Sequence, residues 1–226
     1  MPLEPAENLM RRLSPLLALL LSVTPALAET LDCAVIKSTM PPVELTFDWT
    51  RTEPGKDPLA VHMRRQIIRT ADETVVYEFF SPGKFTRRTL NSAGFRTQVR
   101  TAGEAASAAR VSSYSIDVTK DYLALGEPFG FDEVVKGPDG AVVSDIATSI
   151  SFDGAVDIQL GGCTYSLKKI IEVSHGTARG KPGSNRTEQW YSRDLKTSLY
   201  TRIENGNGAI VEIRARDIST SFTPVE

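Results

Sequence analysis

The chain has 226 residues, with 26 basic and 28 acidic side chains and a formal net charge of −2 at pH 7. This balance argues against a dedicated nucleic-acid-binding protein, because such proteins usually carry a strong excess of basic residues. The length is sufficient for one domain with a hydrophobic core of its own.

The first 28 residues have the three parts of a secretory signal peptide. Arg11 and Arg12 form a basic region, residues 16–23 are apolar, and Ala26-Leu27-Ala28 supplies the small residues that signal peptidase requires. The apolar run of about 8 residues is much shorter than the roughly 20 needed to cross a bilayer, so a short membrane anchor is the weaker alternative. We therefore expect cleavage near Ala28 and a periplasmic or secreted product.

The mature product is expected to be a single β-domain of residues 29–226, whether translation starts at Met1 or at Met10. The residues before Cys33 lack the small and aliphatic pattern of a lipoprotein cleavage site. No later segment is apolar enough to cross a bilayer as a helix. We thus expect no stable membrane anchor, and the oligomeric state stays open.

Two cysteines, Cys33 and Cys163, remain in the mature chain. In an oxidising compartment such a pair is expected to form one structural disulfide, here closing a loop of about 130 residues. A redox or metal-binding pair is the alternative. The two cysteines are far apart and only His62 and His175 could join them, which makes a poor set of metal ligands. We assign no metal and no cofactor.

Apolar residues alternate with polar ones along most of the chain, which predicts β-strands. Near Asp217 the apolar phase changes, which predicts a β-bulge or bend. The clearest alternating segments are residues 45–50, 74–80, 142–152, 163–175, 197–203 and 209–216.

Turn residues separate these segments. The strongest hairpin signal is Asn205-Gly206-Asn207-Gly208, because Asn and Gly tolerate the positive φ angles of tight hairpin turns. Further turns are expected at Pro54-Gly55, Pro82-Gly83, Pro138-Asp139-Gly140, Asp153-Gly154 and Pro182-Gly183.

Helical periodicity is weak. The best helical segments are Ala102–Arg110 and one short turn within Thr119–Leu125. About a dozen strands joined mostly by hairpins predict an all-β fold, in which a single antiparallel sheet forms a barrel, a half-barrel or a sandwich.

Charge is distributed unevenly along the chain. Residues 62–100 contain eight basic and three acidic side chains, a net charge of +5, and residues 127–160 contain one basic and seven acidic side chains, a net charge of −6. The two regions could meet in the fold or present two faces to partners. Ordinary solvated strand faces are the simpler interpretation.

The sequence contains no clear catalytic motif. A serine or cysteine nucleophile would need a histidine held by a carboxylate. The chain contains two histidines, His62 and His175, and no G-x-S-x-G motif. A sugar site could be built from the acidic residues of a loop-like stretch that also contains aromatic side chains. An ordinary surface loop explains that stretch equally simply. The acids are Asp117, Asp121, Glu127, Asp132 and Glu133, and the aromatic residues are Tyr122, Phe129 and Phe131.

Many aromatic residues fall on the expected strands. Their usual role is to fill a core, but a curled sheet could instead use them to line a groove for a lipid or acyl chain. The candidate ligand-binding residues are Phe47, Trp49, Tyr77, Phe79, Tyr165, Trp190 and Tyr191.

The segment Glu188–Lys196, with its continuation into Ile210–Ile213, resembles a motif in lipoprotein-carrier-like periplasmic β half-barrels and in other exported bacterial proteins of similar build. This resemblance covers about 40 residues. It implies an open antiparallel barrel around an apolar interior, with a hydrophobic small molecule or an envelope protein as the partner.

Two functional hypotheses follow. The first is an exported, non-enzymatic binding or scaffold protein that holds an apolar, lipid-like ligand or an envelope partner. The second is an exported hydrolase acting on envelope glycans or esters, with Asp117, Asp121, Glu127 or His175 in its site.

Overall fold

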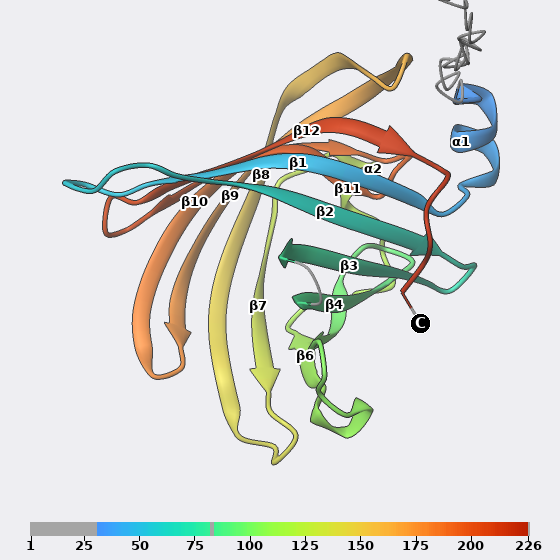
Figure 1. Ribbon diagram of the computed structural model, residues 1–226. Helices are drawn as coiled ribbons and strands as arrows, with labels where there is room; N and C mark the ends of the chain where they lie inside the picture. Colours follow the sequence, from blue (N-terminus) through green and yellow to red (C-terminus); the bar gives the residue numbers. More distant parts are fainter. Residues whose placement is uncertain (1–30, 82–83, 226) are drawn as a thin grey trace, which may run out of the picture.

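The computed structural model describes residues 31–81 and 84–225, which form one closed barrel of antiparallel strands (Figure 1). The all-β prediction is confirmed, and the sheet closes as a barrel. The predicted signal peptide and the Pro82-Gly83 turn lie outside the described residues. The strands are β1 (Val43–Thr52), β2 (Leu59–Arg69), β3 (Glu73–Ser81), β4 (Lys84–Asn91), β5 (Arg96–Thr101), β6 (Arg110–Tyr114), β7 (Phe129–Lys136), β8 (Val142–Leu160), β9 (Cys163–Ala178), β10 (Lys181–Ser192), β11 (Thr197–Asn205) and β12 (Ile210–Ser219).

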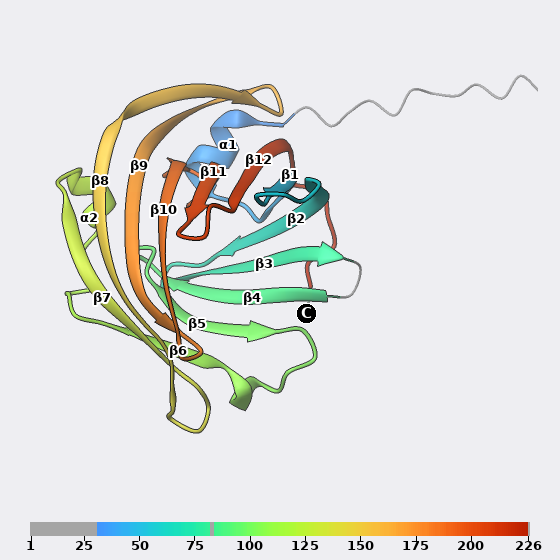
Figure 2. The same ribbon diagram turned by 90° about the vertical axis from the view of Figure 1, so that its left-hand side faces the viewer.

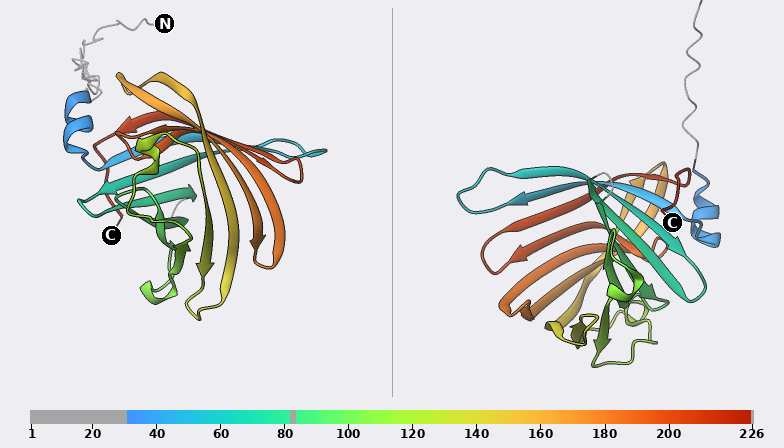
Figure 3. Two further views of the ribbon diagram at one scale, coloured as in Figure 1. Left: turned by 180° about the vertical axis from the view of Figure 1, so that it is seen from behind. Right: turned by 60° about the horizontal axis from the view of Figure 1, so that its bottom comes forward.

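Each strand pairs with its neighbours in sequence, and β1 pairs with β12 to close the barrel. The turns therefore gather at the two ends of the barrel in alternation. The β1–β2, β9–β10 and β11–β12 hairpins lie at the end away from helix α1 (Cys33–Thr39) (Figure 3). The second helix, α2 (Tyr122–Leu125), belongs to the connection between β6 and β7. Within the described residues, no helix is long and apolar enough to cross a membrane.

The largest hydrophobic core fills the end of the barrel near α1. Alternate residues of β1, namely Val43, Leu45 and Phe47, are at most 1% exposed and pack there. The β8–β9 hairpin is longer than its neighbours and bends over this end toward α1 (Figure 2). Helix α1 contributes the buried Ile36. This end is therefore closed by a packed core.

A disulfide between Cys33 and Cys163 joins the start of α1 to the β8–β9 hairpin. Its Cα atoms are 5.5 Å apart, an ordinary distance for such a bond. The predicted pairing is confirmed. The bond ties the chain segment before the barrel to the hairpin that covers the barrel end.

A second, smaller cluster lies on the outer face of β3. Val75, Tyr77 and Phe79 pack there, with Phe85 and Val225 against them. The alternating residues Val76 and Glu78 line the interior cavity described below. On this strand, the more apolar face therefore points away from the barrel interior.

Several of the expected turns are confirmed, and two are wrong. The Asn205–Gly208 hairpin joins β11 to β12, with Asn205 N donating to Ala209 O at 2.9 Å. Asp153-Gly154 instead forms a bulge within β8, since both flanks stay paired with β9 and Gly154 takes the positive φ. Pro182-Gly183 lies inside β10, and the turn comes earlier, at Arg179-Gly180.

The predicted irregularity near Asp217 is confirmed. Thr46 faces Asp217 but Phe47 faces Ala215, so β12 carries one extra residue. The expected helix in Thr119–Leu125 is α2. The expectation of a helix over Ala102–Arg110 is wrong, because only the 3-10 turn Ala106–Ala108 forms before β6 begins at Arg110.

Candidate functional site

A cavity of about 540 Å³ lies inside the barrel, beside the packed end. This volume is within the range of small-molecule sites, roughly 300–1,000 Å³. The lining extends from the β4–β5 turn at Gly94 to Asn185, which pairs with Asn205 next to the β11–β12 turn. The cavity therefore runs along the barrel toward the end away from α1.

One wall of the cavity is aromatic. Phe95 contacts Tyr114 and Phe131 edge to face, with ring centroids 5.2 and 5.8 Å apart. Tyr122 stacks on Phe129 at 4.8 Å. All five rings line the cavity. Such interlocked pairs hold one another in place and present a broad apolar surface.

The connection between β6 and β7, residues 115–128, which we call the strap, positions part of this wall. At one side, Asn91 of β4 donates through Nδ2 to the carbonyl oxygen of Val118 at 2.8 Å. Farther along the strap, Lys168 of β9 donates through Nζ to the carbonyl oxygen of Leu123 at 2.6 Å. The strap thus bridges two separate parts of the barrel and places Tyr122 and Leu123 in the cavity lining.

Asp121 fixes the short helix within the strap. Its carboxylate accepts a hydrogen bond from the backbone N of Ala124 at 2.9 Å, as an N-cap, and pairs with Arg193 at 3.2 Å. Gly126 ends the helix with a positive φ of 75°. These local interactions set the direction in which Tyr122 enters the cavity.

The wall formed by β2, β3 and β4 carries a charged triad that consists of Arg65, Glu78 and Arg88. The Arg65 guanidinium donates twice to Glu78 Oε1, at 2.6 and 3.0 Å, and Arg88 pairs with Oε2 at 2.5 Å. Only 4% of the Glu78 side chain is exposed. Burial would raise the pKa of Glu78, but the two arginines lower it below its usual value.

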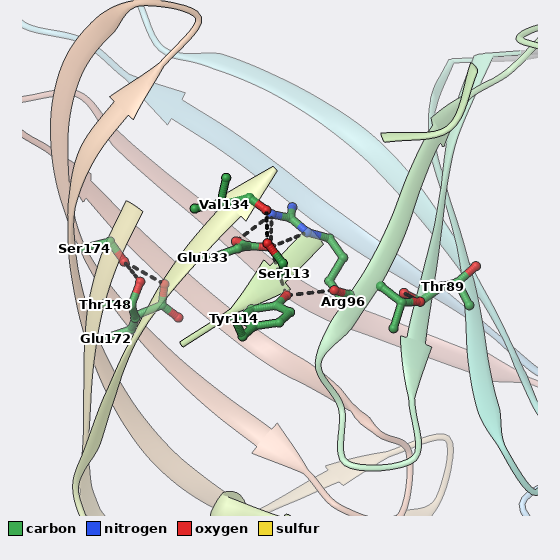
Figure 4. A network of polar contacts seen from close by, with 10 residues as sticks. Thr89, Arg96, Ser113, Tyr114, Glu133, Val134, Thr148, Glu172 and Ser174 are labelled. Atoms are coloured by element: carbon green, nitrogen blue, oxygen red, sulfur yellow. Dashed lines mark hydrogen bonds and ion pairs between the residues drawn. The ribbon is translucent and has the colours of Figure 1, made fainter. Parts of the chain in front are cut away.

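A second charged pair lies on β5 and β7. Arg96 contacts both carboxylate oxygens of Glu133 at 2.7 Å (Figure 4). The Tyr114 hydroxyl lies 2.9 Å from Glu133 Oε1 and 2.8 Å from the Arg96 carbonyl oxygen, and its single proton serves one of them at a time. Burial, followed by the nearby Glu133 charge, raises the pKa of Tyr114. Both carboxylate oxygens of Glu133 are therefore occupied by contacts to protein groups.

Glu172 on β9 is in a different situation. It accepts a hydrogen bond from the Ser174 hydroxyl at 3.1 Å, and Ser174 Oγ lies 3.0 Å from Thr148 Oγ1 (Figure 4). No cation within the described part of the chain forms an ion pair with it. Burial raises its pKa, since desolvation disfavours the charged form. The cavity thus contains one carboxyl group biased toward its neutral form.

The ion pair between Arg96 and Glu133 also shows where the basic and the acidic regions of the sequence meet in the fold. These two residues belong to the basic and the acidic region of the sequence, respectively, and their ion pair brings the two regions together inside the barrel. The acidic excess of residues 127–160 is otherwise spread over exposed positions such as Asp145 and Asp157.

The seven predicted ligand-binding residues occupy different places. Tyr191 lines the cavity. Phe47 and Tyr165 are buried in the core at the α1 end, where Trp49 and Trp190 pack against it. The remaining two, Tyr77 and Phe79, belong to the outer cluster on β3. The structure therefore brings Tyr191 into the candidate site, and a ligand role for these residues stays a prediction.

The residues named for the hydrolase hypothesis do not gather at one place. Asp117 accepts hydrogen bonds from Thr119 in the strap, and Asp121 caps α2. Glu127 and His175 are exposed. No group of three or more metal-ligating side chains occurs among the described residues.

Most cavity residues were not selected from the sequence. The stretch of residues 117–133 was the one sequence pattern that indicated some of them, since four of its members line the cavity: Tyr122, Phe129, Phe131 and Glu133. There, the sequence pattern had suggested a sugar site or an ordinary surface loop. The charged residues on β2–β4 carried no comparable signal, since arginine on a strand is usually exposed.

No protein-family model matches the chain, and no curated protein matches it. Three solved structures share a distant overall likeness. One is the hypothetical lipoprotein YmcC from Escherichia coli, with 10% identity over 76% of this chain and 86% of that one and a TM-score of 0.38. Another is a protein described as a lipoprotein from Parabacteroides distasonis, with 8% identity over 79% of this chain and 95% of that one and a TM-score of 0.39. A third is a protein described as exported, with a YmcC-like fold, from Bacteroides fragilis, with 8% identity over 78% of this chain and 95% of that one and a TM-score of 0.40. At this level of similarity, no property of those proteins is transferred to this chain.

Proposed function

We propose that this protein is an exported, non-enzymatic binding protein that holds an amphipathic small molecule inside its barrel. The observation that carries the proposal is the 540 Å³ cavity, with aromatic rings on one wall and buried charged and polar groups on others. Binding sites for small molecules combine a mostly apolar lining with a few placed polar groups in this way.

The apolar part of the lining is large enough to drive binding. Besides the aromatic wall it includes five isoleucines, and each methylene group that leaves water contributes about 0.8 kcal/mol. An alkyl chain is therefore the simplest partner for this surface. The isoleucines are Ile146, Ile150, Ile170, Ile203 and Ile213.

The Cys33–Cys163 disulfide supports the export part of the proposal. Structural disulfides persist in oxidising compartments and are rare in the cytosol. This agrees with the predicted signal peptide. An envelope protein as a further partner remains a prediction.

A pair of neighbouring substitutions on β8 tests the proposal. Ile150→Trp adds a large side chain within the cavity lining, whereas Ser149→Trp adds the same side chain at an exposed position. Binding of a fluorescent fatty acid to the delipidated protein is expected to survive Ser149→Trp and to weaken at least tenfold with Ile150→Trp. Circular dichroism would verify that both variants fold.

The proposal fails if the delipidated wild-type protein shows no saturable binding of the fluorescent fatty acid or of any dodecyl compound, whatever its headgroup. It also fails if a folded Ile150→Trp variant binds as tightly as the wild type, because the bound molecule would then lie outside the cavity.

A further inference from the structure

We infer that the cavity selects amphipathic molecules with an anionic headgroup, a carboxylate or a phosphate, and that Arg88 binds this headgroup. The inference rests on the proposed function and adds the chemical class of the ligand. It is based on the arrangement of charge in the cavity wall and on the side-chain donors that the protein leaves unused there.

Within the triad, Arg65 and Arg88 share the single carboxylate of Glu78. Arg65 is held mainly by protein groups, since it also donates to Thr197 Oγ1 at 2.7 Å and only 11% of its side chain is exposed. Two cations and one anion leave an excess positive charge on this wall of the cavity. Such an excess favours the approach of an anion, because unpaired charge is costly where water is scarce.

Arg88 is the member of the triad that can reach a ligand. Among the described residues its one ion pair is to Glu78, and the structure gives its guanidinium no other side-chain hydrogen bond. Its side chain keeps 43% of its surface accessible although the residue lines the cavity. The remaining N–H donors are thus available on the cavity side, in a planar group that suits carboxylate and phosphate oxygens.

The other charged groups of the lining do not cancel this excess. Arg96 is neutralised by Glu133. Lys196 lines the cavity and forms no ion pair with the described part of the chain. Counting all charged lining residues, four cations face three carboxylates, a net charge of +1. This rises to +2 when Glu172 is protonated, the form that burial favours.

A cationic headgroup fits this arrangement less well. Glu172 is the carboxyl group that could receive one, since Glu78 and Glu133 are occupied by arginines. Ser174 already donates to Glu172, and ionising Glu172 carries the cost of its burial. The free positive groups, Arg88 and Lys196, would in addition repel a cation.

The test compares dodecyl compounds with the same tail and different headgroups. Delipidated protein would be titrated calorimetrically, below the micelle concentration, with dodecanoate, dodecyl phosphate, dodecanol and dodecyltrimethylammonium. We expect the two anionic compounds to bind at least tenfold more tightly than dodecanol, and the ammonium compound to bind more weakly still. Inorganic phosphate and acetate serve as tail-free anions and are expected to bind at least a hundredfold more weakly than the anionic amphiphiles.

Two adjacent arginines give a matched pair of variants. Arg88→Gln removes the accessible cation and leaves the Arg65–Glu78 pair intact, whereas Arg87→Gln removes the same charge one residue away, outside the cavity lining. We expect Arg88→Gln to lose the preference for anionic headgroups and to keep dodecanol binding. Arg87→Gln is expected to retain the wild-type order. Thermal unfolding would verify that both variants are folded.

The outcomes separate the two proposals. Failure of every dodecyl compound to bind would overturn the proposed function. Equal or tighter binding of dodecanol or of the ammonium compound by the wild type would overturn the headgroup inference alone. So would an unchanged anionic preference in folded Arg88→Gln. Should Arg88→Gln not fold, the wild-type headgroup series still decides the inference.

Discussion

The charged triad in the cavity wall leads to a direct test of how the barrel tolerates buried charge. Replacing Glu78 by Gln keeps the volume of the side chain and removes the charge that pairs with Arg65 and Arg88. Removing one partner from a buried ion pair costs about 3–5 kcal/mol, because the remaining charges are left uncompensated. For a domain of this size, that loss corresponds to a fall in Tm of about 6–20 °C.

The free energy of unfolding would be measured by urea titration, followed by the fluorescence of Trp49 and Trp190. Glu73→Gln is the matched control: it removes a carboxylate from the same strand, at a half-buried position without an ion pair in the described structure. The control is expected to lie within about 0.5 kcal/mol of the wild type. A loss below about 1 kcal/mol for Glu78→Gln would refute the reasoning, since the triad would then be effectively solvated.

The pH dependence supplies a second check on the same variant. The folded-state pKa of Glu78 is lowered, so its contribution to stability is fully present above its ordinary pKa and is lost as the pH falls through the lowered value. The stability difference between wild type and Glu78→Gln should therefore shrink in acid. A difference that stays constant from pH 7 to pH 2 would contradict the assigned ionisation.

Three further predictions concern other parts of the molecule. Replacing Cys33 and Cys163 by Ser should lower the free energy of unfolding by about 5 kcal/mol, as the chain-entropy model gives for a loop of 130 residues; a loss under 1 kcal/mol would contradict it. Burial raises the folded-state pKa of Glu172, so the stabilisation that its neutral form provides is present below its ordinary pKa and is lost as the pH rises through the raised value. Glu172→Gln should therefore match the Tm of the wild type at pH 4 and exceed it at pH 8. The reverse order would refute this. Asp121→Ala should speed hydrogen exchange in the strap, through loss of a helix cap worth about 0.5–2 kcal/mol, while β9 exchanges as before.

The sequence predicted much of the framework because the framework depends on local patterns. Alternating apolar residues identified strands such as β11 and β12, and the Asn205–Gly208 turn identified the hairpin between them. The disulfide followed from the expected compartment and the number of cysteines. These inferences use neighbouring residues or simple counts, which a single sequence supplies directly.

The candidate site was harder to predict because it depends on which face of each strand points inward. On β3, the face with Val75, Tyr77 and Phe79 is the more apolar, and a rule that places apolar residues inside would turn it toward the barrel interior. Phe85 and the C-terminal Val225 cover it from outside, and Glu78 turns inward. Of these two residues, Val225 lies about 150 positions from the cluster, a contact that periodicity cannot reveal.

The charged contacts pose the same problem. Arg65 reaches Thr197 across 132 positions, and Arg96 reaches Glu133 across 37. Nothing in the spacing of these residues identifies them as partners, since their proximity results from closure of the whole sheet.

Closure through β1 and β12 has a consequence for how the protein reaches its folded state. The pairs of this seam are separated by 158–175 positions, from Thr52 with Ile210 to Glu44 with Ser219. Contacts between such distant residues form late, since the entropy of closing the long loop must be overcome first. On the export route proposed above, a chain that crosses the membrane amino end first therefore cannot complete its sheet until nearly all of it has crossed. Until then β1 has a free edge, so the incomplete barrel is the state most exposed to aggregation.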